Sequence, residues 1–198
     1  TGRPKGVRGS LTSGVIPVSV FQLVAGGFAQ SMGLPPKGLS FLNGPLYHSA
    51  QWAFTMFPLF AGSSVVMRHR FDAAETLRVI DDHQVTNLHL VPTQFIRLLK
   101  LPDEVRAGFD GSSLQICWHG AAPCPMETKR RMIEWWGPKI VEYYGATEAS
   151  IVSLATSEQW LAKPGTLGPV QPTVEVTIVG EDGSIKGANE SGTIYIRN

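Results

Sequence analysis

The chain has 198 residues, of which 43% are hydrophobic and 17% charged, so it holds enough apolar material for a core and shows no signature of disorder. Lys plus Arg number 17 against 16 Asp plus Glu, which argues against a nucleic-acid-binding protein with its basic excess. The two cysteines, Cys117 and Cys124, are too few for a disulfide framework and lack the spacing of a zinc site.

The longest apolar stretch and the two ends of the chain bear on its location and completeness. Residues 15–33 are interrupted by Pro17, polar residues and glycines, whereas a membrane-spanning helix needs roughly 20 predominantly apolar residues. We therefore expect no integral membrane segment and a cytoplasmic location, with membrane association left open. The chain begins with Thr1 rather than Met, and residues 192–198 resemble a strand without a following turn, so we interpret both ends as cut.

Short β-rich runs alternate with helical periods over most of the chain. The predicted elements are a buried helix over 11–30, an extended segment over 39–46, a helix over 50–60, a strand over 64–67, a helix that starts at a capping-box spacing over 72–75, a strand over 86–91, a helix around 95–99, a strand over 114–118, a helix over 125–136 and a strand over 140–144. In the helix over 125–136, we expect Lys129, Arg130 and Arg131 to face solvent.

This alternation predicts an α/β fold over residues 1–163, with a largely parallel sheet and flanking helices. From residue 164 the residue pattern changes. Prolines and glycines lead into a predicted strand over 174–179, a turn at 181–183 and a final strand. Residues 164–198 are therefore predicted to begin a small antiparallel β subdomain.

Two polar or small-residue segments follow predicted strands. One runs over 119–123 (His-Gly-Ala-Ala-Pro) and the other over 144–148 (Tyr-Gly-Ala-Thr-Glu). Ligands of open α/β sheets bind at the carboxyl ends of the strands, so both segments are expected at the same edge. The second combines an aromatic face, a hydroxyl and a carboxylate, suited to a base, a phosphate and a metal. Alternatively, the first is a tight connection and the second a solvent-facing strand end.

The opening loop over 1–7 carries Lys5 between glycines. A flexible backbone can turn amides toward phosphate oxygens, and the ammonium group supplies a charge for them. Alternatively, the loop is an ordinary surface turn with a solvated lysine. It does not match the common P-loop, because Gly6 follows Lys5 where Ser or Thr is required, and this disfavours a P-loop hydrolase.

The joint order of these segments resembles the adenylate-forming superfamily, which includes acyl-CoA synthetases, coumarate-CoA ligases, luciferases and peptide-synthetase adenylation domains. The matching motifs are Thr-Gly-Arg-Pro-Lys-Gly-Val (1–7), Gly-Pro-Leu-Tyr-His (44–48), Gly-Ala-Ala-Pro (120–123), Tyr-Gly-Ala-Thr-Glu (144–148), Leu-Gly-Pro (167–169) and Gly-Thr-Ile-Tyr-Ile-Arg (192–197). The resemblance spans essentially the whole chain and favours the acyl-CoA synthetase type, with this chain as part of the large N-terminal domain.

The resemblance implies a nucleotide site and roles within it. Lys5 and its loop cover the β- and γ-phosphates, Thr147 bonds a phosphate oxygen, Glu148 holds Mg2+, and Tyr144 stacks on adenine. Glu142 stands where relatives often carry Asn or Gln, and its carboxylate can accept from the adenine amino group but cannot donate. The implied cofactor-binding set is Thr1, Gly2, Lys5, Gly6, Gly120, Ala121, Ala122, Pro123, Glu142, Tyr143, Tyr144, Gly145 and Thr147.

The resemblance also implies catalytic and acid-binding residues. The catalytic set is Lys5, His48, Thr147 and Glu148, and the substrate pocket is His48, His119, Gly120, Gly145 and Ala146. Amino-acid-activating relatives carry Asp at the position of His48, so His48 favours a simple carboxylic acid. Alternatively, His48 is a structural histidine within the turn that contains it.

The implied activity is ATP-dependent conversion of a fatty, aryl or sterol-derived acid to an acyl-adenylate and then to an acyl-CoA thioester, with ATP, Mg2+ and coenzyme A. An adenylation module that loads a carrier protein, and a noncatalytic nucleotide-binding module of the same fold, stay open as alternatives. The missing start of the phosphate loop and the missing C-terminal domain of the family predict that this fragment alone is inactive.

Overall fold

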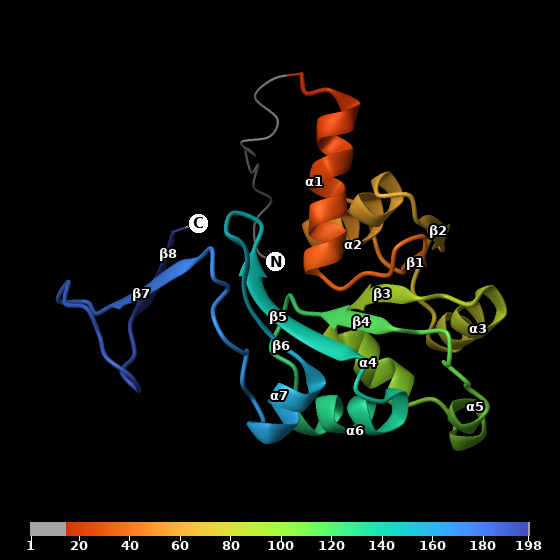
Figure 1. Ribbon diagram of the computed structural model, residues 1–198. Helices are drawn as coiled ribbons and strands as arrows, with labels where there is room; N and C mark the ends of the chain where they lie inside the picture. Colours follow the sequence, from red (N-terminus) through yellow and green to blue (C-terminus); the bar gives the residue numbers. More distant parts are fainter. Residues whose placement is uncertain (1–14, 198) are drawn as a thin grey trace.

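A six-stranded sheet forms the centre of the computed structural model, which describes residues 15–197 (Figure 1). The strands are β1 (Leu39–Leu42), β2 (Ser64–Met67), β3 (Asn87–Leu90), β4 (Ile116–His119), β5 (Ile140–Ala146) and β6 (Ser150–Ala155), in the order β2-β1-β3-β4-β5-β6. All neighbouring pairs are parallel except β5 and β6, which are antiparallel. The predicted α/β fold with a largely parallel sheet is confirmed.

Helices cover both faces of this sheet. They are α1 (Val18–Ser31), α2 (Ser49–Phe60), α3 (Ala73–His83), α4 (Pro92–Leu99), α5 (Asp103–Ala107), α6 (Met126–Trp136) and α7 (Ser157–Ala162). In Figure 1, α1 and α2 lie on one side of the sheet, and α4 and α6 lie on the other. Within residues 15–197, none of the helices has the length and apolarity needed to cross a bilayer.

A second sheet contains two antiparallel strands, β7 (Glu175–Val179) and β8 (Thr193–Arg197). This hairpin extends away from the main sheet (Figure 1). The predicted antiparallel β structure near the end of the chain is therefore confirmed.

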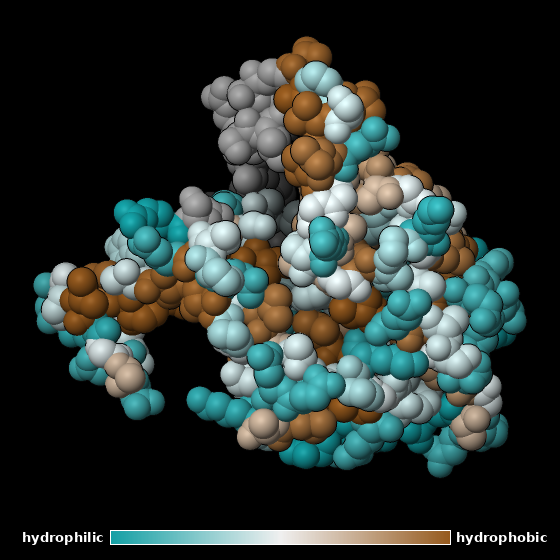
Figure 2. Space-filling model, in the orientation of Figure 1, coloured by the Kyte–Doolittle hydropathy of each residue, from teal (hydrophilic) through white to brown (hydrophobic). Residues whose placement is uncertain are grey.

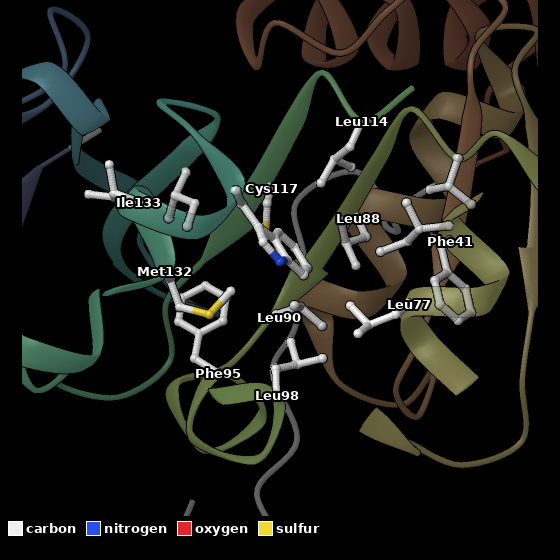
Figure 3. Packing of buried hydrophobic residues seen from close by; sticks show 14 of the residues in the cluster. Phe41, Leu77, Leu88, Leu90, Phe95, Leu98, Leu114, Cys117, Met132 and Ile133 are labelled. Carbon is white, nitrogen blue, oxygen red and sulfur yellow. The ribbon is translucent and has the colours of Figure 1, made fainter. Parts of the chain in front are cut away.

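The central strands direct alternate side chains to two hydrophobic clusters, as the two-residue period of a strand requires. The larger cluster faces α3, α4 and α6 and includes Leu88, Leu90 and Cys117 (Figure 3). The smaller cluster lies on the side of α2 and includes Phe54, Trp118 and Val141. This alternation determines which polar side chains of β3, β4 and β5 reach the carboxyl-terminal edge on the side of α2.

The first helix is more exposed than its sequence predicts. Of the predicted 11–30 helix, residues 15–17 are not helical, and α1 begins at Val18. It buries Ala25 alone, while Val18 and Leu23 are 68% and 78% exposed. Residues 11–14 lie outside the described part of the chain. Figure 2 shows hydrophobic side chains on the outer surface of α1. Packing of Phe21 and Phe28 onto Phe57 of α2 holds the helix in place on one side only.

The capping box predicted at the start of α3 forms only in part. The Asp72 carboxylate accepts the Glu75 backbone N–H at 2.8 Å, which satisfies one free amide of the first turn. The Glu75 side chain instead accepts from Arg68 Nε at 2.8 Å, so it ties α3 to the end of β2.

The basic face predicted for α6 is also wrong at one position. Lys129 is fully buried, and its Nζ donates to Glu142 Oε2 of β5 at 2.6 Å. The ammonium group also lies 5.2 Å from the centroid of the Trp160 ring of α7. A buried lysine keeps its charge only when it is paired, and Glu142 supplies the pair.

Candidate functional site

A cavity of about 710 Å³ opens where the carboxyl ends of β3, β4 and β5 meet α2. It brings together segments that are far apart in the sequence, as the shared edge of parallel strands predicts. The predicted site residues that line it are His48, Ala121, Ala122, Tyr143, Gly145, Ala146, Thr147 and Glu148.

The backbone comes close to itself at the wall of this cavity. A Cβ atom at Gly145 would stand 2.1 Å from the carbonyl oxygen of Ser150, so no side chain fits there. The register of β5 and β6 shifts between Tyr144 and Gly145. Ala121 has a φ of 68°, a left-handed conformation that costs energy for a residue with a Cβ. Such backbone positions concentrate at functional sites.

A hydrogen bond joins the start of α2 to the loop after β5. Ser49 Oγ and Thr147 Oγ1 are 3.1 Å apart, although 98 positions separate them in the sequence. His48 is the residue before α2, is exposed, and packs its ring 4.6 Å from the Tyr47 ring. The bond therefore places His48 and Thr147 at the same side of the cavity.

Two predicted site residues lie on the opposite face of the sheet. Glu142 and His119 are neighbours in the β4–β5 register, and neither is among the residues that line the cavity. Glu142 is bound by Lys129, and His119 Nε2 lies 3.8 Å from Glu142 Oε2. Because strand side chains alternate, both point toward α4 and α6. Neither side chain lines the cavity in this structure, and their expected contacts, of Glu142 with adenine and of His119 with the acid, stay predictions.

His119 is a buried imidazole with unusual surroundings. Its side chain is 0% exposed, and among the described residues neither ring nitrogen has a hydrogen-bond partner. Its ring packs against Phe95 at 5.0 Å. Burial, with the charge of Lys129, holds the pKa of His119 well below its ordinary value, so the ring is neutral at pH 7.

Three further predicted residues flank the cavity without lining it. Gly120 is buried, and a Cβ there would come within 2.8 Å of the Tyr143 ring. Tyr144 is 37% exposed, and Pro123 is exposed. Stacking of adenine on Tyr144 stays a prediction. The predicted phosphate-loop residues Thr1, Gly2, Lys5 and Gly6 lie outside the described residues, so their roles also stay predictions.

Sequence reasoning missed two polar residues of the cavity wall, Gln51 of α2 and His89 of β3. Gln51 Nε2 is 3.2 Å from both His89 Nδ1 and the His89 carbonyl oxygen, and His89 Nε2 is 3.0 Å from the Tyr143 hydroxyl. Burial lowers the pKa of His89 to about 3 and raises that of Tyr143 to about 12. The sequence did contain a signal for His89, because it stands between Leu88 and Leu90 in a predicted buried strand. A polar residue in such a strand needs a hydrogen-bond partner.

The carboxylate of Glu148 fits a phosphate-bound Mg2+ rather than a metal centre made by the protein alone. Within the described residues, no group of three or more His, Cys, Asp or Glu side chains could hold an ion. Mg2+ is commonly held by one or two carboxylates together with substrate phosphates and water. The single carboxylate of Glu148, in a cavity that Thr147 also lines, fits that pattern.

Comparison with known proteins relates this geometry to a family. The model of a family described as AMP-binding enzyme matches residues 1–198. A long-chain-fatty-acid–CoA ligase of Bacillus subtilis is 34% identical over 137 residues, which are 69% of this chain and 24% of that protein. Acyl-CoA synthetase 7 of Caenorhabditis elegans is 29% identical over 204 residues, covering 100% of this chain and 36% of that protein. The chain thus spans about a quarter to a third of these relatives.

Solved structures share the fold. The amide bond synthetase McbA of Marinactinospora thermotolerans superposes with a TM-score of 0.77 at 23% identity, over 90% of this chain and 37% of that one. The o-succinylbenzoate CoA synthetase of Bacillus subtilis, in complex with its acyl-adenylate intermediate, gives a TM-score of 0.73 at 23% identity, over 89% and 36%. At these identities the likeness establishes the fold alone.

Proposed function

Because the chain belongs to the AMP-binding enzyme family, we propose that it forms the nucleotide- and acid-binding part of an ATP-dependent ligase for a carboxylic acid. The reaction has two steps. First, a carboxylate oxygen of the acid attacks the α-phosphorus of ATP, and the bond to pyrophosphate breaks to leave an acyl-adenylate. Second, the thiol of coenzyme A loses its proton and displaces AMP from the acyl carbon, which gives a thioester.

One observation carries this proposal: His48, Ala121, Thr147 and Glu148 line a single cavity although they come from three distant segments. Joining a carboxylate to a phosphate brings two anions together, so the site must supply positive charge and hydrogen-bond donors. The Thr147 hydroxyl can donate to a phosphate oxygen, and Glu148 can hold a cation. Mg2+, when bound there, neutralises part of the phosphate charge.

The small residues of the cavity wall suit a flat ring. Ala121 and Ala122 follow β4 and Gly145 lies within β5, so these three residues contribute only backbone and methyl groups to the wall. An adenine ring can lie against such a surface at van der Waals distance. This supports the nucleotide role that the family membership suggests.

The other walls of the cavity suit an apolar acid. Phe28, Phe54 and Ile151 contribute hydrophobic side chains, and His48 supplies no fixed negative charge that would pair with an amino acid. Relatives of this chain are named as fatty-acid–CoA and 4-coumarate–CoA ligase-like proteins, which are names of enzymes for hydrophobic acids. A hydrophobic carboxylic acid is thus the proposed substrate class.

The direct test is ATP–pyrophosphate exchange by a full-length protein that includes this chain. We expect exchange that depends on one or more acids of a panel of fatty, aromatic and sterol-derived acids. Absence of exchange with every acid would contradict adenylation. Adding coenzyme A and following the thioester then separates a CoA ligase from a module that loads a carrier protein, because only the former releases acyl-CoA.

A second test separates an enzyme from a noncatalytic nucleotide-binding module. Glu148→Gln removes the charge at the cavity while keeping its shape, so Mg2+-dependent ATP binding should weaken roughly tenfold or more. Glu134→Gln, on the exposed side of α6, is the matched control and should leave binding unchanged. Calorimetric titration with and without Mg2+ measures both. Equal binding by the two variants would favour the noncatalytic alternative.

A further inference from the structure

Three polar side chains of the cavity wall, Gln51, His89 and Tyr143, form a hydrogen-bonded chain. They come from α2, β3 and β5, and the first two are 5% and 2% exposed. The His89 ring stacks on Phe54 with centroids 5.2 Å apart, so its orientation is held by packing as well as by hydrogen bonds. Buried polar groups of this kind take definite donor and acceptor roles, and these can be assigned from chemistry.

The orientation of the Gln51 amide follows from its contact with the backbone. Of the two terminal atoms of the Gln51 amide, one lies 3.2 Å from the carbonyl oxygen of His89, and a carbonyl oxygen can only accept a hydrogen bond. That atom is therefore the amide nitrogen. The same nitrogen is 3.2 Å from His89 Nδ1, so Nδ1 faces a donor and must accept with its lone pair.

The tautomer of His89 follows in turn. Burial lowers the pKa of His89 to about 3, so the ring is neutral and carries a single N–H. With Nδ1 accepting from Gln51, the proton is on Nε2. His89 Nε2 then donates to the Tyr143 hydroxyl oxygen, 3.0 Å away.

The Tyr143 hydroxyl is left with a proton to donate. Burial raises the pKa of Tyr143 to about 12, so the phenol is not ionised at pH 7. Among the described residues, His89 is the hydrogen-bond partner of this hydroxyl, and it serves as the donor. Tyr143 lines the cavity beside the hydrophobic side chains of Phe54 and Ile151. A plain hydrocarbon chain bound there would leave the donor without an acceptor, which is costly.

We infer that the Tyr143 hydroxyl, oriented by Gln51 and His89, selects acids whose otherwise apolar acyl group carries an oxygen acceptor, such as a keto group. This inference rests on the proposed function. Tyr143 acts here as a specificity residue that touches the acyl group, and His89 and Gln51 act as positioning residues. The keto group is the most informative probe because its oxygen accepts and cannot donate.

The test uses a full-length protein that includes this chain and a straight-chain saturated acid with its set of single-keto isomers. The wild type should use one or more keto isomers with a kcat/KM about tenfold above the plain acid, the effect of about one hydrogen bond. Tyr143→Phe should lower the ratio of kcat/KM for the preferred keto acid to kcat/KM for the plain acid about tenfold, whatever its effect on the plain acid. Tyr195→Phe, an exposed residue of β8 outside the cavity, makes the same chemical change and should alter neither value.

The outcomes distinguish this inference from the proposed function. Exchange with plain acids and no keto preference in the wild type would overturn the inference alone, as would equal losses for both acids in Tyr143→Phe. Exchange with no acid at all would overturn the proposed function and this inference with it. Nitrogen-15 NMR of labelled histidine, assigned with His89→Gln, gives an independent readout, because a proton on Nδ1 of His89 would contradict the donor chain.

Discussion

At the scale of single residues, the cavity wall depends on a glycine that lies against another part of the backbone. We expect Gly145→Ala to destabilise the protein by about 1–3 kcal/mol, because its Cβ would meet a backbone oxygen at 2.1 Å that cannot move without disturbing β6. Gly27→Ala is the control. Gly27 is an exposed residue within α1 with no atom within 4 Å of its added Cβ, so this change should be neutral or stabilising by about 0.5–1 kcal/mol. Denaturant unfolding measures both, and equal effects would contradict the close approach.

The two buried histidines make a pH dependence that can be worked out from their protonation. His89 has a pKa of about 3 in the folded protein, against roughly 6.5 when unfolded. Between these values only the unfolded chain binds the proton, so the stability present above about pH 6.5 is lost progressively as the pH falls toward 3. The slope for His89 approaches about 1.4 kcal/mol per pH unit, and the lowered pKa of His119 acts in the same direction.

Unfolding by denaturant at pH 7, 6 and 5 measures this slope. His89→Gln should reduce it by the share of one histidine, whereas His83→Gln, at an exposed position in the last turn of α3, should leave it unchanged. An unaltered slope in His89→Gln would show that His89 is not buried as a neutral ring.

At the scale of elements, the ion pair between Lys129 of α6 and Glu142 of β5 links a helix to the strand that carries the candidate site. Lys129→Ala leaves the Glu142 carboxylate buried without its cation, and we expect a loss of about 3–5 kcal/mol in the free energy of unfolding. The double variant Lys129→Met with Glu142→Leu replaces both charges with apolar groups and should recover most of that loss. Thermal unfolding of the wild type, the single variant and the double variant measures these differences. A double variant as unstable as the single one would contradict the claim that the unpaired Glu142 carboxylate causes the loss.

The same pair shows what the sequence could predict about elements. The helical period of residues 126–136 and the strand at 140–144 were evident, and both form. The burial of Lys129 was not, because a lysine beside two arginines is typical of a solvated face, and its partner lies 13 positions away in another element. Similarly, the apolar residues of α1 indicated a buried helix, while the described neighbours cover only the side that packs on α2.

At the scale of the whole molecule, the site depends on the order of the strands, which local patterns do not contain. The sequence could place the segments after β4 and β5 at one edge, because consecutive parallel strands share their polarity. It could not place β1 between β2 and β3, which brings α2 over the sheet and Ser49 next to Thr147. It also could not assign Glu142 and His119 to the far face, because that requires the register in which Trp118 pairs with Val141.

The hairpin of β7 and β8 allows the independence of the two sheets to be tested. We predict that ending the chain after Pro172 leaves the free energy of unfolding of the six-stranded sheet unchanged within about 0.5 kcal/mol, the scale of a surface change. The bridge between Ser153 and Val170 would be retained, so β6 keeps its contact with the segment that follows α7. All five tryptophans lie between residues 52 and 160, so tryptophan fluorescence reports on the larger sheet alone in both the 198-residue and the shortened chain. If the free energy of unfolding falls by several times that margin, the hairpin contributes to the stability of the larger sheet, and the two sheets are not independent.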